Sequence, residues 1–234
     1  MQFGLMYEIQ IPKPWRVRSE YDAYQQVVAQ VQLGEREGFS SCWTVEHHFL
    51  SEYSHCSAPE VLYGYLAAKT STIRIGHGVA LLPFPYNHPV RVAERVATLD
   101  ILSNGRVEFG TGRSGTIIEL EGFGIPPDET RPRWEEALDM IPKMWTQETF
   151  SYQGTYFNIP ERSIVPKPLQ KPHPPIWMAA TSSESHEIAG HKGIGLLSLT
   201  TLLTPDDILS RVTRYREALR DAIPVGCIMN PRVA

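Results

Sequence analysis

Ser41-Cys42-Trp43-Thr44-Val45-Glu46-His47-His48 is the stretch from which the fold can be inferred. It begins as a short apolar strand and ends in one carboxylate and two imidazoles. In α/β barrels the groups that perform chemistry lie at the carboxyl ends of the strands. Because side chains alternate along a strand, Glu46 and His48 are expected on one side and His47 on the other. The stretch therefore predicts a strand whose end carries a functional site.

Strand-like and helix-like segments alternate on both sides of this stretch. Apolar residues at helical spacing, such as Tyr24, Val27, Val28 and Val31, follow most of the expected strands. This alternation implies a parallel sheet with helices outside it. The count is one strand short of a (β/α)8 fold, so we predict an α/β TIM-type barrel that lacks the eighth strand and the C-terminal helices. The expected strands are 3–7, 41–48, 73–82, 106–109, 176–180, 194–199 and 225–229.

The chain is expected to form a single domain over residues 1–234, because no linker divides it. Within it, residues 112–131 are expected as a loop insertion and 148–175 as a hairpin and proline-rich connector. A barrel without its last strand has two unpaired sheet edges. We therefore expect low stability or aggregation of this length of chain by itself.

Composition excludes several classes of partner. A net charge of -4 gives no basic field for nucleic acid or anionic lipid. The apolar runs stay below the roughly 18 residues of a membrane span. Three cysteines, far apart in the sequence, predict a reducing compartment, and the N-terminus does not resemble a signal peptide. The sequence thus predicts a cytoplasmic protein that binds neither nucleic acid nor membrane.

His47 is the first candidate for chemistry, because an imidazole transfers protons near neutral pH and Glu46 precedes it. The alternative is that these groups cap the strand or bond a neighbouring loop. A metal site formed by His47, His48 and His55 is a further alternative, although adjacent strand residues diverge.

Glycines and hydroxyls mark two other expected strand ends. Residues 110–115 match G-x-G-x-x-G, but they follow the fourth strand and no long apolar helix comes after them, which argues against a dinucleotide-binding turn. What remains is a glycine-lined strand end with one cation, Arg113. Residues 181–185 place hydroxyls at a helix start, which suits either an anion or simple capping. Arg131 is a candidate phosphate clamp or a surface ion-pair partner.

Taken together, these motifs resemble the bacterial luciferase-like flavin monooxygenases over nearly the whole chain. The block from Leu102 to Arg113 is the most specific part of the likeness. Thr181 and Gly112 depart from the luciferase α chain, so we expect a monooxygenase with a substrate other than a long-chain aldehyde. The motifs are Trp43-x-x-Glu46-His47-His48, Gly78-Val79-Ala80-Leu81-Leu82-Pro83, Leu102-Ser103-Asn104-Gly105-Arg106 with Gly110 to Arg113, and Ala179-Ala180-Thr181-Ser182.

The resemblance implies reduced FMN as a co-substrate, O2 and a small organic substrate. It also implies a separate flavin reductase, a homodimer and a reaction through a flavin C4a-hydroperoxide. His47 would be the catalytic histidine with Glu46 beside it, and a non-prolyl cis peptide would fall near Gly78-Val79. The implied cofactor contacts are Gly78, Val79, Arg113, Arg131, Thr181, Ser182 and Ser185.

Two alternatives remain open at this point. One is an F420-dependent oxidoreductase of the same superfamily that transfers hydride without oxygen. The other is a non-catalytic flavin-binding partner subunit, against which the combination of Glu46, His47 and Arg113 argues. The substrate itself is not readable from the sequence.

Overall fold

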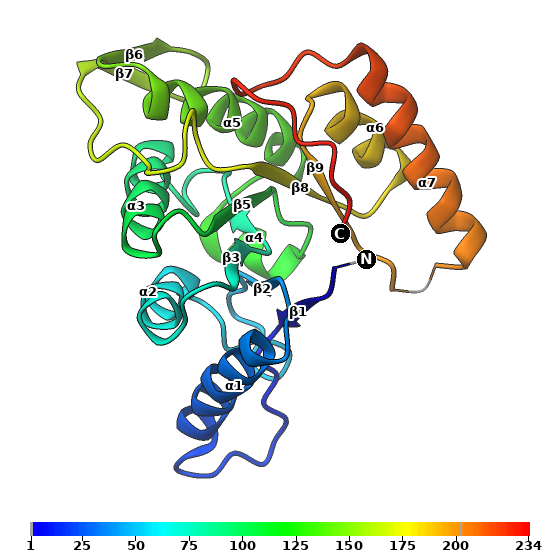
Figure 1. The fold of residues 1–234 in the computed structure, drawn as a ribbon. Helices are drawn as coiled ribbons and strands as arrows, with labels where there is room; N and C mark the ends of the chain where they lie inside the picture. Colours follow the sequence, from blue (N-terminus) through cyan, green and yellow to red (C-terminus); the bar gives the residue numbers. More distant parts are fainter. Residues whose placement is uncertain (1, 202) are drawn as a thin grey trace.

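A curled parallel sheet, which forms a half-barrel, organises the computed structural model (Figure 1), which describes residues 2–201 and 203–234. Its main strands stand side by side in chain order, and every neighbouring pair is parallel. All their carboxyl ends therefore lie at the same rim. The strands are β1 (Gly4–Tyr7), β2 (Ser41–Thr44), β3 (Arg74–His77), β5 (Val107–Gly112), β8 (Ile176–Ala180) and β9 (Gly195–Ser198), and β4 (Ala80–Leu81) pairs with β5.

Helices cross over between consecutive strands and cover the outer face of the sheet (Figure 1). Parallel neighbours need such crossovers, because the chain must return to the same end of the sheet. A hairpin of β6 (Phe150–Gln153) and β7 (Asn158–Arg162) extends from the helix layer. The helices are α1 (Ser19–Arg36), α2 (Pro59–Lys69), α3 (Pro89–Leu102), α4 (Ile117–Phe123), α5 (Thr130–Thr146), α6 (Ser183–His191) and α7 (Pro205–Ala218), with short 3-10 turns at Pro127–Glu129 and Leu219–Asp221.

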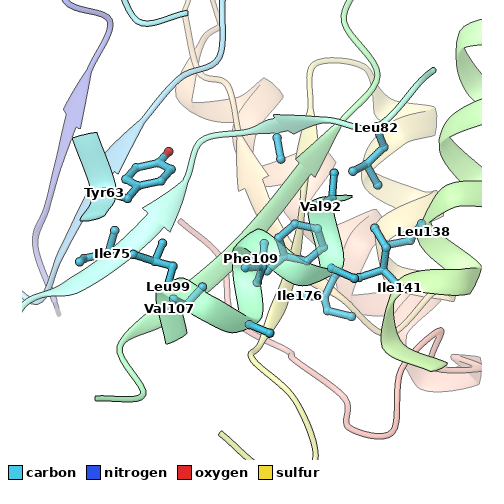
Figure 2. Packing of buried hydrophobic residues seen from close by; sticks show 14 of the residues in the cluster. Tyr63, Ile75, Leu82, Val92, Leu99, Val107, Phe109, Leu138, Ile141 and Ile176 are labelled. Atoms are coloured by element: carbon cyan, nitrogen blue, oxygen red, sulfur yellow. The ribbon is translucent and has the colours of Figure 1, made fainter. Parts of the chain in front are cut away.

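The hydrophobic core lies between the sheet and these helices. Phe109 of β5 is fully buried among side chains of α5 and the neighbouring strand β8, including Leu138, Ile141 and Ile176 (Figure 2). Its ring also meets Trp145 edge-on at 5.2 Å. Burying a side chain of this size stabilises the fold by about 1.5–3 kcal/mol. The core thus fixes β5, the strand that is followed directly by Arg113.

The opposite face of the sheet carries a second, more polar layer. Trp43 of β2 and Trp177 of β8 meet edge-on at 5.4 Å, and Gly76 between them leaves room for the Trp43 ring. Glu108 is buried in this layer, where it accepts hydrogen bonds from Trp177 at 2.6 Å and from both Nη atoms of Arg232 at 2.9 and 2.7 Å. The inside of the half-barrel is therefore filled by side chains.

The prediction of a TIM-type barrel lacking its last strand is confirmed at the level of the fold. Two local expectations differ. The expected strand 73–82 is divided into β3 and β4. The expected loop 112–131 contains α4, which is only seven residues long and is followed by Gly124 in the left-handed region.

The expected seventh strand, 225–229, is wrong. In that segment the Cys227 N–H donates to His173 Nε2 at 2.9 Å instead of to a neighbouring strand. Pairing with β9 begins later, where Leu196 bridges Val233 and the Leu196 N–H bonds the Arg232 carbonyl at 3.0 Å. The apolar run 225–229 is therefore not a strand, and contact with β9 comes from the isolated bridge at Val233.

Within the described residues, no helix combines the length and the apolar character needed to cross a membrane.

Candidate active site

His47 lies just beyond the end of β2, between two carboxylates. Its Nδ1 is 3.0 Å from Glu119 Oε1, and its Nε2 is 3.7 Å from Glu8 Oε2. Glu8 directly follows β1, and Glu119 lies on α4. The ring of Tyr53 packs edge-on against the imidazole at 5.6 Å. The rim of the sheet therefore supplies an imidazole with a carboxylate on either side.

Glu119 is the site residue that the sequence reasoning missed. Its side chain is fully buried, and it accepts hydrogen bonds from the His48 N–H at 2.7 Å and from Ser114 Oγ at 3.0 Å. With the contact to His47, these bonds hold the carboxylate in one position. The helix that carries Glu119 is too short to show a repeat of apolar residues in the sequence. The one hint was a glutamate in a segment that was expected to be a loop.

The electrostatics of this pair favour a proton on His47. Burial by itself lowers the pKa of His47, but the hydrogen bond and charge of Glu119, and the charges of Glu8 and Glu46, outweigh it and raise the pKa above its usual value. Burial by itself raises the pKa of Glu119, but the hydrogen bonds from His47 and from the His48 N–H outweigh it and lower the pKa. Burial raises the pKa of Glu8.

Glu46 points away from His47, as the alternation of side chains predicts. Its Oε1 is 3.4 Å from His48 Nε2, and its two oxygens accept hydrogen bonds from Asn87 Nδ2 and the Leu81 N–H, both at 2.8 Å. Its charge still reaches His47 and contributes to the raised pKa. The direct partner of the His47 imidazole is therefore Glu119, not the adjacent Glu46.

Arg113 and Arg131 are connected through Thr130, the residue that precedes Arg131 at the start of α5. Arg113 follows β5 and donates to Thr130 Oγ1 at 3.0 Å, at the start of α5. Arg131, the next residue of α5, binds Glu184 of α6 with both Nη atoms, at 2.6 and 2.9 Å. Arg131, and to a lesser degree Arg113, lowers the pKa of Glu184. The Arg131 guanidinium thus binds the start of α6, while that of Arg113 contacts the start of α5.

The start of α6 is a capping box. Ser182 Oγ accepts the Ser185 N–H at 3.2 Å, and Ser185 Oγ accepts the Ser182 N–H at 3.0 Å. Thr181 precedes the cap, and its carbonyl accepts a hydrogen bond from Arg211 of α7. Ser182 and Ser185, which the resemblance implies as cofactor contacts, therefore also cap α6. Glu184, in the first turn of the same helix, binds Arg131.

The segment between β3 and β4 has the geometry that the resemblance implies, because the peptide bond between Gly78 and Val79 is cis. The glycines of β5 serve close packing of the strands. A Cβ at Gly110 would lie 1.9 Å from the His77 carbonyl oxygen, and one at Gly112 would lie 2.4 Å from Val79 Cγ2. The room beside these two glycines is therefore taken up by β3 and by Val79.

The three histidines considered as metal ligands each face a different carboxylate. His47 contacts Glu119, His48 contacts Glu46, and His55 contacts Glu20. In the part of the chain that the structure describes, no group of three or more His, Cys, Asp or Glu side chains could hold a metal ion.

The chain belongs to the luciferase-like monooxygenase family, whose sequence model matches residues 1–226. The flavin-dependent trigonelline monooxygenase oxygenase component of Acinetobacter baylyi is 32% identical over 178 residues, which are 75% of this chain and 48% of that protein. The limonene 1,2-monooxygenase of Rhodococcus erythropolis is 32% identical over 189 residues, 80% of this chain and 48% of that protein. The chain thus spans about half the length of these curated relatives.

Solved structures share the fold. A monooxygenase from Streptomyces bottropensis superposes with a TM-score of 0.85 at 27% identity, covering 95% of this chain and 67% of that one. The oxygenating constituent of 3,6-diketocamphane monooxygenase from Pseudomonas putida, solved with FMN, gives 0.83 at 21% identity over 96% and 64%. An F420-dependent secondary alcohol dehydrogenase gives 0.78 at 21% identity over 94% and 64%. The last two show likeness of fold alone.

Proposed function

We propose that the chain is the catalytic part of an FMN-dependent monooxygenase that uses reduced FMN and O2 to oxidise a small organic substrate. The observation that carries this proposal is the arrangement at one rim of the sheet. There, His47 lies between two carboxylates, and Ser114 bonds one of them. The preceding residue, Arg113, bonds Thr130 at the start of α5, next to Arg131. The family and its monooxygenase relatives support it.

The residues at the start of α5 and α6 fit the phosphate of FMN. Arg131 already holds an anion, the Glu184 carboxylate, in a two-point contact of the kind that guanidinium groups make with phosphate. Arg113 brings a second positive charge, and the first turn of α6 adds backbone N–H groups. Arg131, Arg113, Ser182 and Ser185 would hold the phosphate, and Gly78-Val79 would face the ring.

Reduced FMN would supply the activation of O2, with one oxygen atom transferred to the substrate and the other released as water. The chain's own part is proton control. With Nδ1 bonded to Glu119, His47 presents Nε2 as the atom that gives or takes a proton.

The electrons would come from a separate flavin reductase. One relative is named as an oxygenase component, which is consistent with such a division of labour. A homodimer and a cytoplasmic location belong to the same proposal. Hydride transfer with F420 and a non-catalytic, flavin-binding role are the competing candidates, and the first shares this fold.

Equilibrium titration with FMN, riboflavin and F420 tests the cofactor. We expect FMN to bind more tightly than F420, and Arg131→Gln to weaken FMN binding about tenfold, as the loss of a charged hydrogen-bonded contact does. Riboflavin, which lacks the phosphate, should bind both forms equally. Arg214→Gln, at an exposed position on α7, is the matched control. Tighter binding of F420 than of FMN would favour the hydride-transfer alternative.

A further inference from the structure

Glu46 precedes His47 in the chain but reaches into the layer between the sheet and two helices. The cavity beside it has a volume of about 20 Å³ and is also lined by Glu60 of α2, Arg95 of α3 and His77 of β3. A single water molecule needs about 10–15 Å³ of such space. An organic substrate therefore does not fit beside the Glu46 carboxylate on this side, which argues for a role other than direct chemistry.

The carboxylate instead holds the backbone of β4. Glu46 Oε2 accepts the Leu81 N–H at 2.8 Å, and Oε1 accepts Asn87 Nδ2 at 2.8 Å. The same Asn87 amide donates to the Leu81 carbonyl at 2.9 Å. The N–H and the carbonyl of Leu81 are thus both hydrogen-bonded to side chains. Glu46, Leu81 and Asn87 are all buried.

The position of β4 explains why side chains, and not a second strand, form hydrogen bonds to its backbone. Among the described residues β4 has a strand partner on one side, β5, through Ala80–Thr111 and Leu81–Gly112. β3 pairs with β2, but β4 is offset from that line. A buried backbone N–H without a partner destabilises the fold, because it loses its hydrogen bond to water and gains none. Glu46 and Asn87 fill the place that a neighbouring strand would otherwise take.

The contact continues outward into the helix layer. Arg95 of α3 donates to Asn87 Oδ1 and, at 2.5 Å, to Glu60 Oε1 of α2. Asn87 is therefore held at its oxygen as well as at its nitrogen, so its amide is oriented with the N–H groups towards Glu46 and Leu81. The series Glu60, Arg95, Asn87 and Glu46 connects two helices to the free edge of β4.

We propose that Glu46 is a positioning residue: it fixes β4, and through β4 the adjoining Gly78-Val79 backbone, against the end of β2, while proton handling belongs to His47 and Glu119. The part that concerns Gly78-Val79 as a flavin contact rests on the proposed function. The clamp on β4 is a property of the chain by itself and can be measured without any flavin.

Amide hydrogen exchange at Leu81 in the flavin-free chain tests the clamp. In Glu46→Gln the side chain has a single oxygen, so it can accept a hydrogen bond from only one of the two donors, the Leu81 N–H or Asn87 Nδ2. Exchange at Leu81 should rise about tenfold, the effect of losing one buried hydrogen bond. The double variant Glu46→Gln/Asn87→Asp restores a donor facing an acceptor between positions 46 and 87 but loses the hydrogen bond to the Leu81 carbonyl, so it should recover only part of the protection. Glu60→Gln, at the outer end of the series, should change exchange at Leu81 much less than Glu46→Gln does.

The second measurement separates positioning from catalysis. Glu46→Gln should weaken binding of reduced FMN, while turnover at saturating FMN is kept. The pH profile of that turnover should move to lower pH, because the charge of Glu46 contributes to the raised pKa of His47. Unchanged exchange at Leu81 in Glu46→Gln would overturn the proposal, and so would full FMN affinity combined with loss of turnover. If the wild type binds no reduced FMN, the proposed function fails, but the exchange comparison still decides whether Glu46 clamps β4.

Discussion

His47 and Glu119 determine what the candidate site can do at the scale of single residues. The sequence predicted the histidine correctly as a group at a strand end, but it paired that histidine with the neighbouring glutamate. In the structure the partner comes from a residue 72 positions further along the chain. A long-range contact of this kind depends on how α4 folds back over the rim, and a single sequence carries no record of it.

Glu119→Gln should lower the pKa of His47, because the charge that offsets burial is removed while the side-chain shape is kept. An NMR titration of the His47 ring measures this directly. Glu121→Gln, at an exposed position on the same helix, is the control and should leave the pKa of His47 unchanged. The assignment of Glu119 as partner is wrong if both variants titrate like the wild type.

The same variant should also lose stability in a pH-dependent way. Folding raises the pKa of His47. The interaction of His47 with Glu119 therefore stabilises the fold fully below the usual pKa of 6.5, and progressively less as the pH rises through the raised pKa. On the acid side, the contribution of Glu119 is full above its usual pKa of 4.5 and is lost progressively as the pH falls from there through the lowered pKa. The loss in Glu119→Gln should be about 1.5–3 kcal/mol between these limits and smaller at high pH.

At the scale of elements, α6 and α7 offer a comparison, because each begins with a capping box. Ser182 and Ser185 form that of α6, and Thr204 and Asp207 form that of α7. The start of α6 was predicted from the sequence, since a cap depends on residues only a few positions apart. The failures, α4 and the expected strand 225–229, are segments whose conformation depends on contacts with distant parts of the chain.

Ser182→Ala and Thr204→Ala should each destabilise the fold by about 1 kcal/mol, the usual effect of losing a helix cap. Chemical denaturation measures this loss. If the start of α6 also binds the FMN phosphate, only Ser182→Ala should weaken FMN binding. An equal loss of affinity in both variants would mean that the effect comes from general stability and not from a contact at α6.

At the scale of the whole molecule, strand–helix alternation was sufficient to predict a parallel TIM-type sheet that lacks its last strand, and the rim at which the candidate site residues lie. It could not predict the polar layer inside. Glu108 sits within a strand, and its partners Arg74, Trp177 and Arg232 come from three other segments. Local sequence patterns do not encode which distant side chains meet on the inner face of a curled sheet.

The central claim is that this rim handles reduced flavin and oxygen, and the rate of flavin reoxidation tests it most directly. Reduced FMN is mixed with oxygenated buffer in the presence and absence of the chain, and the return of the absorbance of oxidised flavin is followed. We predict that this absorbance returns much more slowly with the chain present, and faster again in His47→Gln. Immediate formation of oxidised flavin, at the rate seen without protein, would contradict the account.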